Sequence, residues 1–164
     1  MKDKIAKLSR MMIEFDRETP DRVNHFLKVY GFAKSIGELE GLDQQTQFTL
    51  ETAALVHDVG IKISRQKYGD GGWRHQEIEG PPVARRMLEE LAFPPEMIER
   101  VCFLVAHHHT YNAVDGADYQ ILLEADFLVN IFEKGMNRSQ IAAIRDKNFR
   151  TKTGMEYINW LFLS

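Results

Sequence analysis

Apolar residues recur at helical spacing through almost all of the 164 residues, and this feature constrains the fold more than any other. In residues 19–41 the apolar side chains stand three or four positions apart, which places them on one face of a helix. Thr19 and Pro20 are typical of a helix start, and Gly41 is typical of a helix end. No segment alternates polar and apolar residues as a strand would. The sequence therefore predicts an all-α protein.

The same signals predict further helices along the chain. They are expected at residues 3–17, 44–57, 81–93, 94–109, 117–135, 139–149 and 154–163. Residues 60–80 break the pattern, because they hold five of the eleven glycines together with several cations and aromatic side chains. We predict a glycine-rich loop there that covers a binding site, with a solvated connector as the alternative.

Length and composition predict one domain over residues 1–164. Hydrophobic residues make up 44% of the chain and charged residues 27%, which is ordinary for a globular protein. The motifs with candidate site residues lie within residues 19–135, so we expect residues 136–164 to form C-terminal helices that pack on this core. The apolar segment "INWLFLS" at residues 158–164 predicts such docking, with an oligomer contact as the alternative.

Charge and cysteine content limit the partners and the compartment. The net charge is −3 without a long basic block, so a large nucleic acid is not an expected partner, although a small anion could bind a local cationic cluster. Cys102 is the single cysteine, which excludes an intrachain disulfide and favours the reducing cytoplasm. No apolar stretch reaches the roughly 18 residues of a membrane span, so no membrane partner is expected. The sequence gives no prediction of the oligomeric state.

Four polar residues stand on the apolar faces of four predicted helices. They are His25, His57, His108 and Asp126. A single histidine at such a position is usually a core residue with a satisfied hydrogen bond. Four such polar residues on four helices need another explanation, because a buried ionised carboxylate costs several kcal/mol unless it is paired or bound to a metal. A shared divalent cation would satisfy imidazole and carboxylate groups together, so the pattern predicts a metal site.

Two local runs of polar residues raise the question of which side chains face this site. His57 and Asp58 are adjacent and would point about 100° apart in the middle of a helix. They can converge at a last helical turn, where Gly60 would let the chain bend away. Of the three histidines in "HHH" at 107–109, two can face the site; His108 is favoured by periodicity and His109 by its place at the helix end.

Five segments in this order resemble the HD-domain superfamily of metal-dependent phosphohydrolases. They are "RVNH" at 22–25, "LVHDVG" at 55–60, "HQEIEG" at 75–80, "LVAHHH" at 104–109 and "EADFLVN" at 124–130. The resemblance is to the short, stand-alone bacterial members. The chain lacks the Gly-Tyr-Pro motif of the branch that cleaves cyclic di-GMP. It is also shorter than the deoxynucleotide triphosphohydrolases and the mammalian-type cyclic nucleotide phosphodiesterases.

The resemblance implies specific ligands. Its primary metal ligands fall on His25, His57, Asp58 and Asp126. In members with two metals, Asp58 would bridge to a second ion held by His75, His108 and His109. Mixed imidazole and carboxylate ligands fit manganese, iron, cobalt, nickel or zinc, as one ion or two, with magnesium as a further candidate.

The resemblance and the residues together predict hydrolysis of a small phosphorylated substrate. A divalent ion lowers the pKa of bound water from about 15.7 toward 7, and Asp58 is placed to ligate and to orient the attacking water. We expect Lys62 to contact a phosphoryl oxygen, with Arg22 at the same mouth; solvated surface cations are the alternatives. Trp73 could stack on a nucleobase or simply pack the loop.

Glu79 could hold His75 or a water as a supporting group, or could be a charge at a helix start.

Two functions remain open from the sequence. The predicted enzyme would cleave a phosphomonoester or phosphodiester bond of a nucleotide or a similar metabolite. The alternative is a non-catalytic, metal-containing sensor module that binds a nucleotide or another anion.

Overall fold

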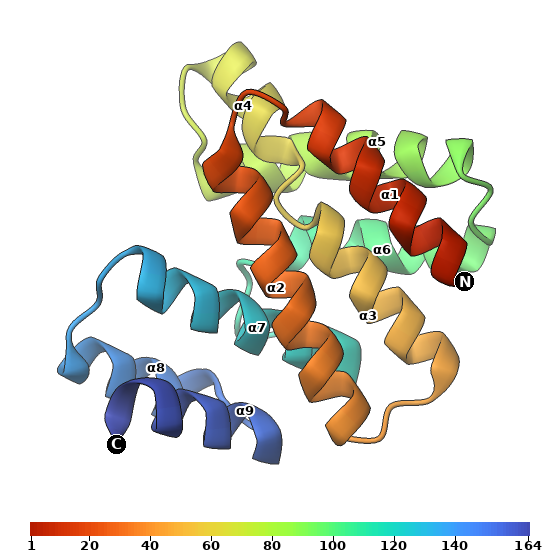
Figure 1. The fold of residues 1–164 in the computed structure, drawn as a ribbon. Coiled ribbons are helices and arrows are strands. Elements are labelled where there is room, and N and C mark those ends of the chain that lie inside the picture. Colours follow the sequence, from red (N-terminus) through yellow and green to blue (C-terminus); the bar gives the residue numbers. More distant parts are fainter.

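A computed structural model describes residues 1–164, apart from the side chain of Lys2. The predicted all-α class is confirmed: the described residues form nine α-helices, a short π-helix and no strand (Figure 1). The elements are α1 (Lys2–Phe15), α2 (Pro20–Leu39), α3 (Gln44–Val56), α4 (Gly60–Tyr68), α5 (Trp73–Glu90), α6 (Pro95–His107), α7 (Ala117–Glu133), α8 (Arg138–Asn148), α9 (Lys152–Ile158) and η1 (Asn159–Leu163).

The predicted helix boundaries coincide with residues that pair the free backbone groups at helix ends or that let the chain turn there. The side chain of Asp43 accepts hydrogen bonds from the backbone N–H groups of Gln45 and Thr46, both at 3.0 Å, and so begins α3. Gly41 and Gly135 have φ angles of +76° and +58°, in the left-handed region that suits glycine after a helix. These local signals place α2, α3 and α7 close to where the sequence predicts them.

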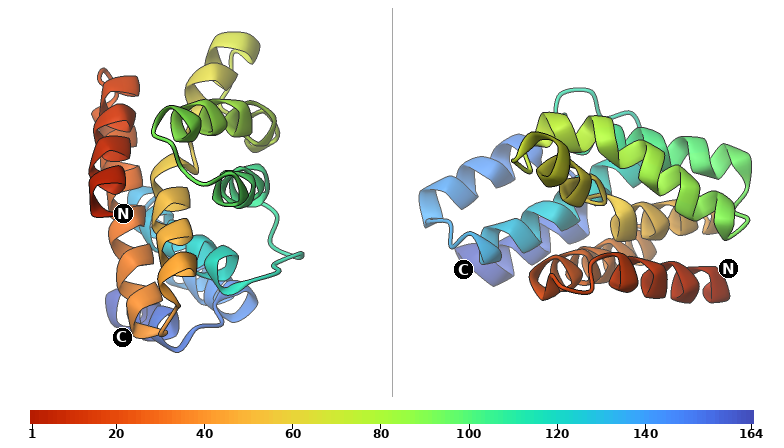
Figure 2. Two further views of the ribbon diagram at one scale, coloured as in Figure 1. Left: turned by 90° about the vertical axis from the view of Figure 1, so that its right-hand side faces the viewer. Right: turned by 90° about the horizontal axis from the view of Figure 1, so that it is seen from above.

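Helix α3 lies at the centre of the molecule. Every residue from Thr49 to Val56 is buried, as expected of a helix that is covered on all sides. Helices α1, α2, α6 and α7 all pack against it. Figure 2 shows α2 on one side of α3 and α6 on the other, while α7 packs against both α2 and α3. The carboxyl end of this central helix therefore places whatever follows it, His57 and Asp58, in the interior.

Residues 60–80 are mostly helical, so the predicted glycine-rich loop is wrong. Helix α4 occupies 60–68, α5 begins at Trp73, and a short turn at 69–72 joins them. Two of the glycines serve close packing instead of flexibility. A Cβ atom on Gly60 would lie 2.5 Å from the Gln76 carbonyl oxygen, and one on Gly80 would lie 2.7 Å from Val105 Cγ1.

The paired prolines of α5 also lie elsewhere than expected. Pro81 and Pro82 were predicted to begin a helix, but they stand inside α5, which starts at Trp73. Proline lacks the N–H that an interior helical position normally donates, so this position departs from the usual preference. The burial of the flanking residues Glu79, Gly80, Val83 and Ala84 supplies the tertiary packing that overrides it.

Replacing Gly60 with alanine is expected to destabilise the protein by about 1–3 kcal/mol, because the added methyl group meets backbone atoms of α5 that cannot move independently. Gly31→Ala is the matched control. Gly31 lies within α2 with no neighbour within 4 Å of an added Cβ, so its replacement should be neutral or stabilising by up to about 1 kcal/mol. Urea unfolding of both variants measures the difference, and equal midpoints would contradict the packing role.

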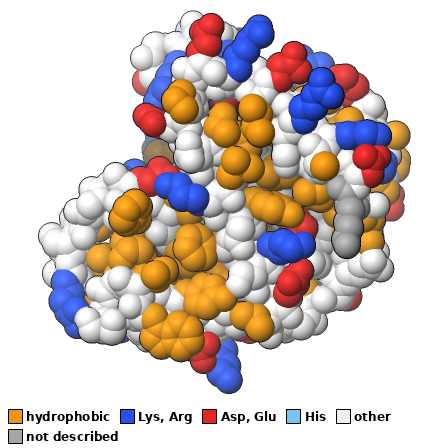
Figure 3. Space-filling model, in the orientation of Figure 1, with side chains coloured by type: hydrophobic (Ala, Val, Ile, Leu, Met, Phe, Trp, Pro, Cys, Tyr) orange, Lys and Arg blue, Asp and Glu red, His pale blue; other side chains and the backbone are white. Residues whose placement is uncertain are grey.

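The C-terminal apolar segment docks only in part. Ile158 is fully buried, whereas Trp160 is 64% exposed and Leu161 is 55% exposed. Orange side chains gather on the lower front of Figure 3, where α2 and α9 face the viewer in Figure 1. The segment therefore packs on the core through Ile158, Phe162 and Leu163, while the terminal turn presents Trp160 and Leu161 to solvent. No helix among the described residues is long and apolar enough to cross a membrane.

Candidate metal centre

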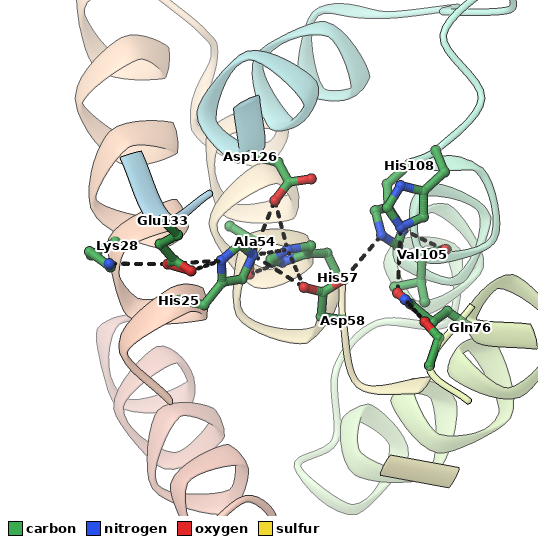
Figure 4. Close-up of polar contacts among 12 residues, drawn as sticks. His25, Lys28, Ala54, His57, Asp58, Gln76, Val105, His108, Asp126 and Glu133 are labelled. Carbon is green, nitrogen blue, oxygen red and sulfur yellow. Dashed lines mark hydrogen bonds and ion pairs between the residues drawn. The ribbon is translucent and has the colours of Figure 1, made fainter. Parts of the chain in front are cut away.

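Side chains from three regions of the chain converge beside the end of α3 (Figure 4). His25 comes from α2, His57 and Asp58 from the junction of α3 and α4, and Asp126 from α7. His25 Nε2 lies 3.1 Å from Asp126 Oδ1, 3.1 Å from Asp58 Oδ2 and 3.3 Å from His57 Nε2. His57 Nε2 lies 3.3 Å from Asp58 Oδ2 and 3.4 Å from Asp126 Oδ1. These four residues, whose ligand atoms lie within 4.8 Å of one another, could hold a metal ion. We call them the primary cluster.

The break between α3 and α4 lets two adjacent residues face one point. Helix α3 ends at Val56, and His57 and Asp58 occupy the connection before α4 begins at Gly60. His57 Nδ1 donates to the Ala54 carbonyl at 2.7 Å, which fixes its ring. Gly60 is predicted to let the chain bend away, but in the structure it begins a second helix, α4.

The tautomers of the histidines show that the donor set fits a cation. His57 Nδ1 and His108 Nδ1 face the carbonyls of Ala54 and Val105, and His25 Nδ1 faces the Glu133 carboxylate at 3.1 Å. Because these oxygens only accept, each Nδ1 carries the proton, and each neutral ring then directs an Nε2 lone pair at a carboxylate. Lone pairs and carboxylates at 3.1–3.4 Å repel one another unless protons or a metal ion lie between them.

The electrostatics of the primary cluster show the same demand for positive charge. Burial lowers the pKa of His25, but hydrogen bonds to Asp126 and Asp58 outweigh burial and raise it to about 9. The pKa of His57 is also raised well above its ordinary value, by the charge of Asp58 against the effect of burial. Burial favours the neutral form of Asp58, yet the charge of His57 and the close approach of His108 and His25 hold its pKa well below its usual range. A metal ion would replace these protons.

A second group shares Asp58 with the primary cluster. His108 and His109 lie beside this carboxylate, and the three residues together could also hold an ion. His108 Nε2 is 3.2 Å from Asp58 Oδ1, yet it is buried in a geometry that makes no hydrogen bond. An unsatisfied buried nitrogen of this kind suits a metal ligand. His107 instead stacks on Phe103, with ring centroids 4.2 Å apart.

The structure does not bring His75 into this second group. Its Nδ1 lies 2.9 Å from Asp70 Oδ1, and its ring stacks on Tyr68 at a centroid distance of 3.8 Å. The next residue, Gln76, is buried and lies closer to the site, with its Oε1 3.4 Å from His109 Nε2. The ligand role of His75, which came from the resemblance, stays a prediction.

The other predicted contacts lie at differing distances from the cluster. Lys62 points away from it, because its Nζ donates to the Phe15 carbonyl at 2.6 Å. Arg22 lines the cavity above the primary cluster but is paired with Asp16 at 3.0 Å. Trp73 is 48% exposed and contacts Arg74 instead of the cavity. Glu79 accepts hydrogen bonds from Lys67 and Tyr68, so it reaches His75 only through the stacked Tyr68 ring.

A cavity of about 390 Å³ opens above the primary cluster. Its walls come from α1, α2, α4, α7, the 69–72 turn and the start of α5, and Figure 3 shows the surface notched on the left between the α4 and α7 regions. Gln76, Arg65 and Glu133 are among the lining residues that were not predicted from the sequence to belong to the site. Glu133 stands seven positions after Asp126, so the same helical face was the signal that could have identified it.

Replacing Glu133 with glutamine is expected to weaken metal binding about 10-fold to 100-fold. The carboxylate accepts from His25 Nδ1 and is held by Lys28 at 3.1 Å, so it fixes the ring that presents Nε2. Glu96→Gln, at an exposed position of α6, is the control for the loss of one charge. Competition with a metal-binding dye measures the affinity, and equal affinities for both variants would show that Glu133 does not support His25.

Comparisons with known proteins agree with this geometry. The model of the HD domain family matches residues 22–144, and the chain therefore belongs to this family. A crystal structure of a predicted HD superfamily hydrolase from an uncultured Thermotogales bacterium superposes with a TM-score of 0.65 at 21% sequence identity. The match covers 97% of this chain and 83% of the other, and it supports the same fold. No curated protein matches this chain significantly.

Proposed function

We propose that this HD-domain protein is a metal-dependent phosphohydrolase that cleaves a phosphomonoester or phosphodiester bond of a nucleotide or a similar small metabolite. The observation that carries the proposal is the convergence of the His25, His57 and Asp126 ligand atoms with Asp58 at the wall of an open cavity. A divalent ion bound there would supply an acidified water and neutralise charge on a phosphoryl group. Asp58 belongs both to the primary cluster and to the group with His108. This sharing suits a site that binds both water and phosphate.

The residues of the chain have separable roles in this proposal. His25, His57 and Asp126 would hold the ion, and Glu133 would keep His25 in the required tautomer. Asp58 would also orient the attacking water, since its two oxygens face different histidines. Burial lowers the pKa of His109 to about 4, so its ring is a neutral imidazole at physiological pH. A neutral ring can bind an ion through its free nitrogen.

The test is reconstitution followed by a substrate screen. The protein is stripped of metal, reloaded separately with manganese, iron, cobalt, nickel, zinc or magnesium, and assayed with p-nitrophenyl phosphate, bis(p-nitrophenyl) phosphate and a panel of nucleotides. We expect phosphate-ester cleavage with at least one ion, and its loss on chelation. Tight metal binding without cleavage of any ester would instead favour the metal-containing sensor module that binds a nucleotide or another anion.

A further inference from the structure

The cavity above the primary cluster is larger than the cluster itself requires. Its volume of about 390 Å³ lies in the range of small-molecule pockets. A single phosphoryl group at the metal would fill only part of it. The remaining space extends toward the α4 wall, where Ile61, Arg65 and Gly71 line the cavity. A substrate that occupies the whole cavity therefore meets this wall as well as the cluster.

The charges around the cavity differ from one wall to another. Asp16, Asp21 and Glu133 line it along α1, α2 and α7. Arg22 is paired with Asp16 through both its Nε and Nη2 atoms, at 3.2 and 3.0 Å. This side offers no unpaired guanidinium to an anion. A divalent ion and the two carboxylates that hold it together carry no net charge, so a second anionic group would need a cation of its own.

Arg65 is the cation placed to meet that need. Its backbone carbonyl accepts a hydrogen bond from Gly69, while its guanidinium has no hydrogen-bond or ion-pair partner among the described side chains. A Cβ atom on Gly71 would lie 3.3 Å from Arg65 Nε and 3.4 Å from Ile61 Cγ2, so the arginine lies across this glycine in contact with the turn. Lys134 also lines the cavity, but it is a point charge on a flexible stem and lacks the planar fork.

The turn beneath Arg65 is held in place from inside the cavity. Gln76 Nε2 donates to the Gly71 carbonyl, and Asp70 Oδ1 accepts from the Gly72 N–H at 2.8 Å. The turn that Arg65 contacts is therefore tied to Gln76, a buried residue that lies beside His109. Arg65 itself is exposed, and its unpaired planar guanidinium can donate two parallel hydrogen bonds to a phosphoryl group.

We infer that Arg65 forms a second anion subsite, and that the substrate carries a second phosphoryl group beyond the one at the metal, as in a compound with a diphosphate. This inference rests on the proposed function for the position of the first phosphoryl group. It assigns substrate selection to α4, through a residue three positions beyond the predicted Lys62. The two phosphoryl groups span the cavity between the primary cluster and the 69–72 turn.

Anion binding tests the subsite without turnover. Calorimetry of the zinc-loaded protein compares phosphate with methylenediphosphonate, whose two phosphoryl groups are joined by a bond that water does not cleave, and the metal content is measured after each titration. We expect wild type to bind methylenediphosphonate about 10-fold to 100-fold more tightly than phosphate. Arg65→Gln should bring this ratio to within about 3-fold and leave phosphate binding unchanged. Arg74→Gln removes the same charge from a side chain that rests on Trp73 and should keep the wild-type ratio.

The outcomes separate this inference from the proposed function. A wild-type ratio in Arg65→Gln would overturn the subsite, whether both affinities are unchanged or both fall by the same factor. That result, in a protein that still cleaves phosphate esters, would leave the proposed function standing. Conversely, a ratio that depends on Arg65 in a protein that cleaves no ester would overturn the proposed function and support the subsite alone.

Discussion

Replacing Asp58 with asparagine is expected to lower kcat for any phosphate ester by at least about 10²–10³-fold. Asp58 is the one carboxylate among the described residues that belongs to both groups of potential ligands. Its Oδ2 faces His25 and His57, and its Oδ1 faces His108. Asparagine keeps the shape but removes the charge and one acceptor oxygen, so it weakens the hold on an ion and the orientation of water together.

The measurement requires separation of catalysis from folding and metal content. Circular dichroism and the metal stoichiometry of Asp58→Asn are compared with wild type before initial rates are measured at saturating metal. Asp146→Asn, at an exposed position of α8, controls for the loss of a carboxylate and should keep wild-type rates. Wild-type turnover in Asp58→Asn with a full complement of metal would remove this residue from the mechanism.

The sequence predicts the primary cluster because its members violate the helical pattern. His25, His57 and Asp126 are polar residues on otherwise apolar faces, and an energetic cost of that kind needs a compensating partner wherever the helices pack. Periodicity carries this information, since it tells which face of each helix is buried. His108 is identified in the same way, and its Nε2 is buried without a hydrogen bond.

The walls of the cavity could not be predicted in the same way. Lys62 and Arg65 both lie on α4. Because residues 60–80 are predicted as a loop, no helical periodicity indicates that these two side chains point in different directions. The glycines suggested flexibility, whereas Gly60 and Gly80 are required by the close approach of backbones. Whether a glycine here provides flexibility or close packing depends on the contacts between α4, α5 and α6, and those contacts are a tertiary property. His75 is a related case, since its stacking on Tyr68 depends on the turn between α4 and α5.

Metal affinity is expected to rise at least about 10-fold per pH unit between pH 6.5 and about 8, and by at least about 50-fold from pH 7 to pH 9. His25 has a pKa of about 9 in the metal-free protein, so binding of an ion through its Nε2 must displace a proton throughout this range. His57, with a raised pKa as well, adds to the slope. Asp58 and Asp126, whose pKa values are lowered, stay ionised in this window and do not contribute.

The stabilities of the metal-free and the metal-loaded protein should therefore change with pH in opposite directions. In the metal-free protein, the raised pKa of His25 contributes stability that is fully present below its unfolded value of about 6.5 and is lost as the pH rises through about 9. The shift from 6.5 corresponds to about 3 kcal/mol of differential interaction. In the metal-loaded protein the ion occupies this position, so acid weakens the fold by protonating the ligands. Thermal unfolding with and without zinc at pH 6.5, 7.5 and 8.5 measures both trends. Parallel curves for the two forms would show that the ion and the protons do not compete for His25.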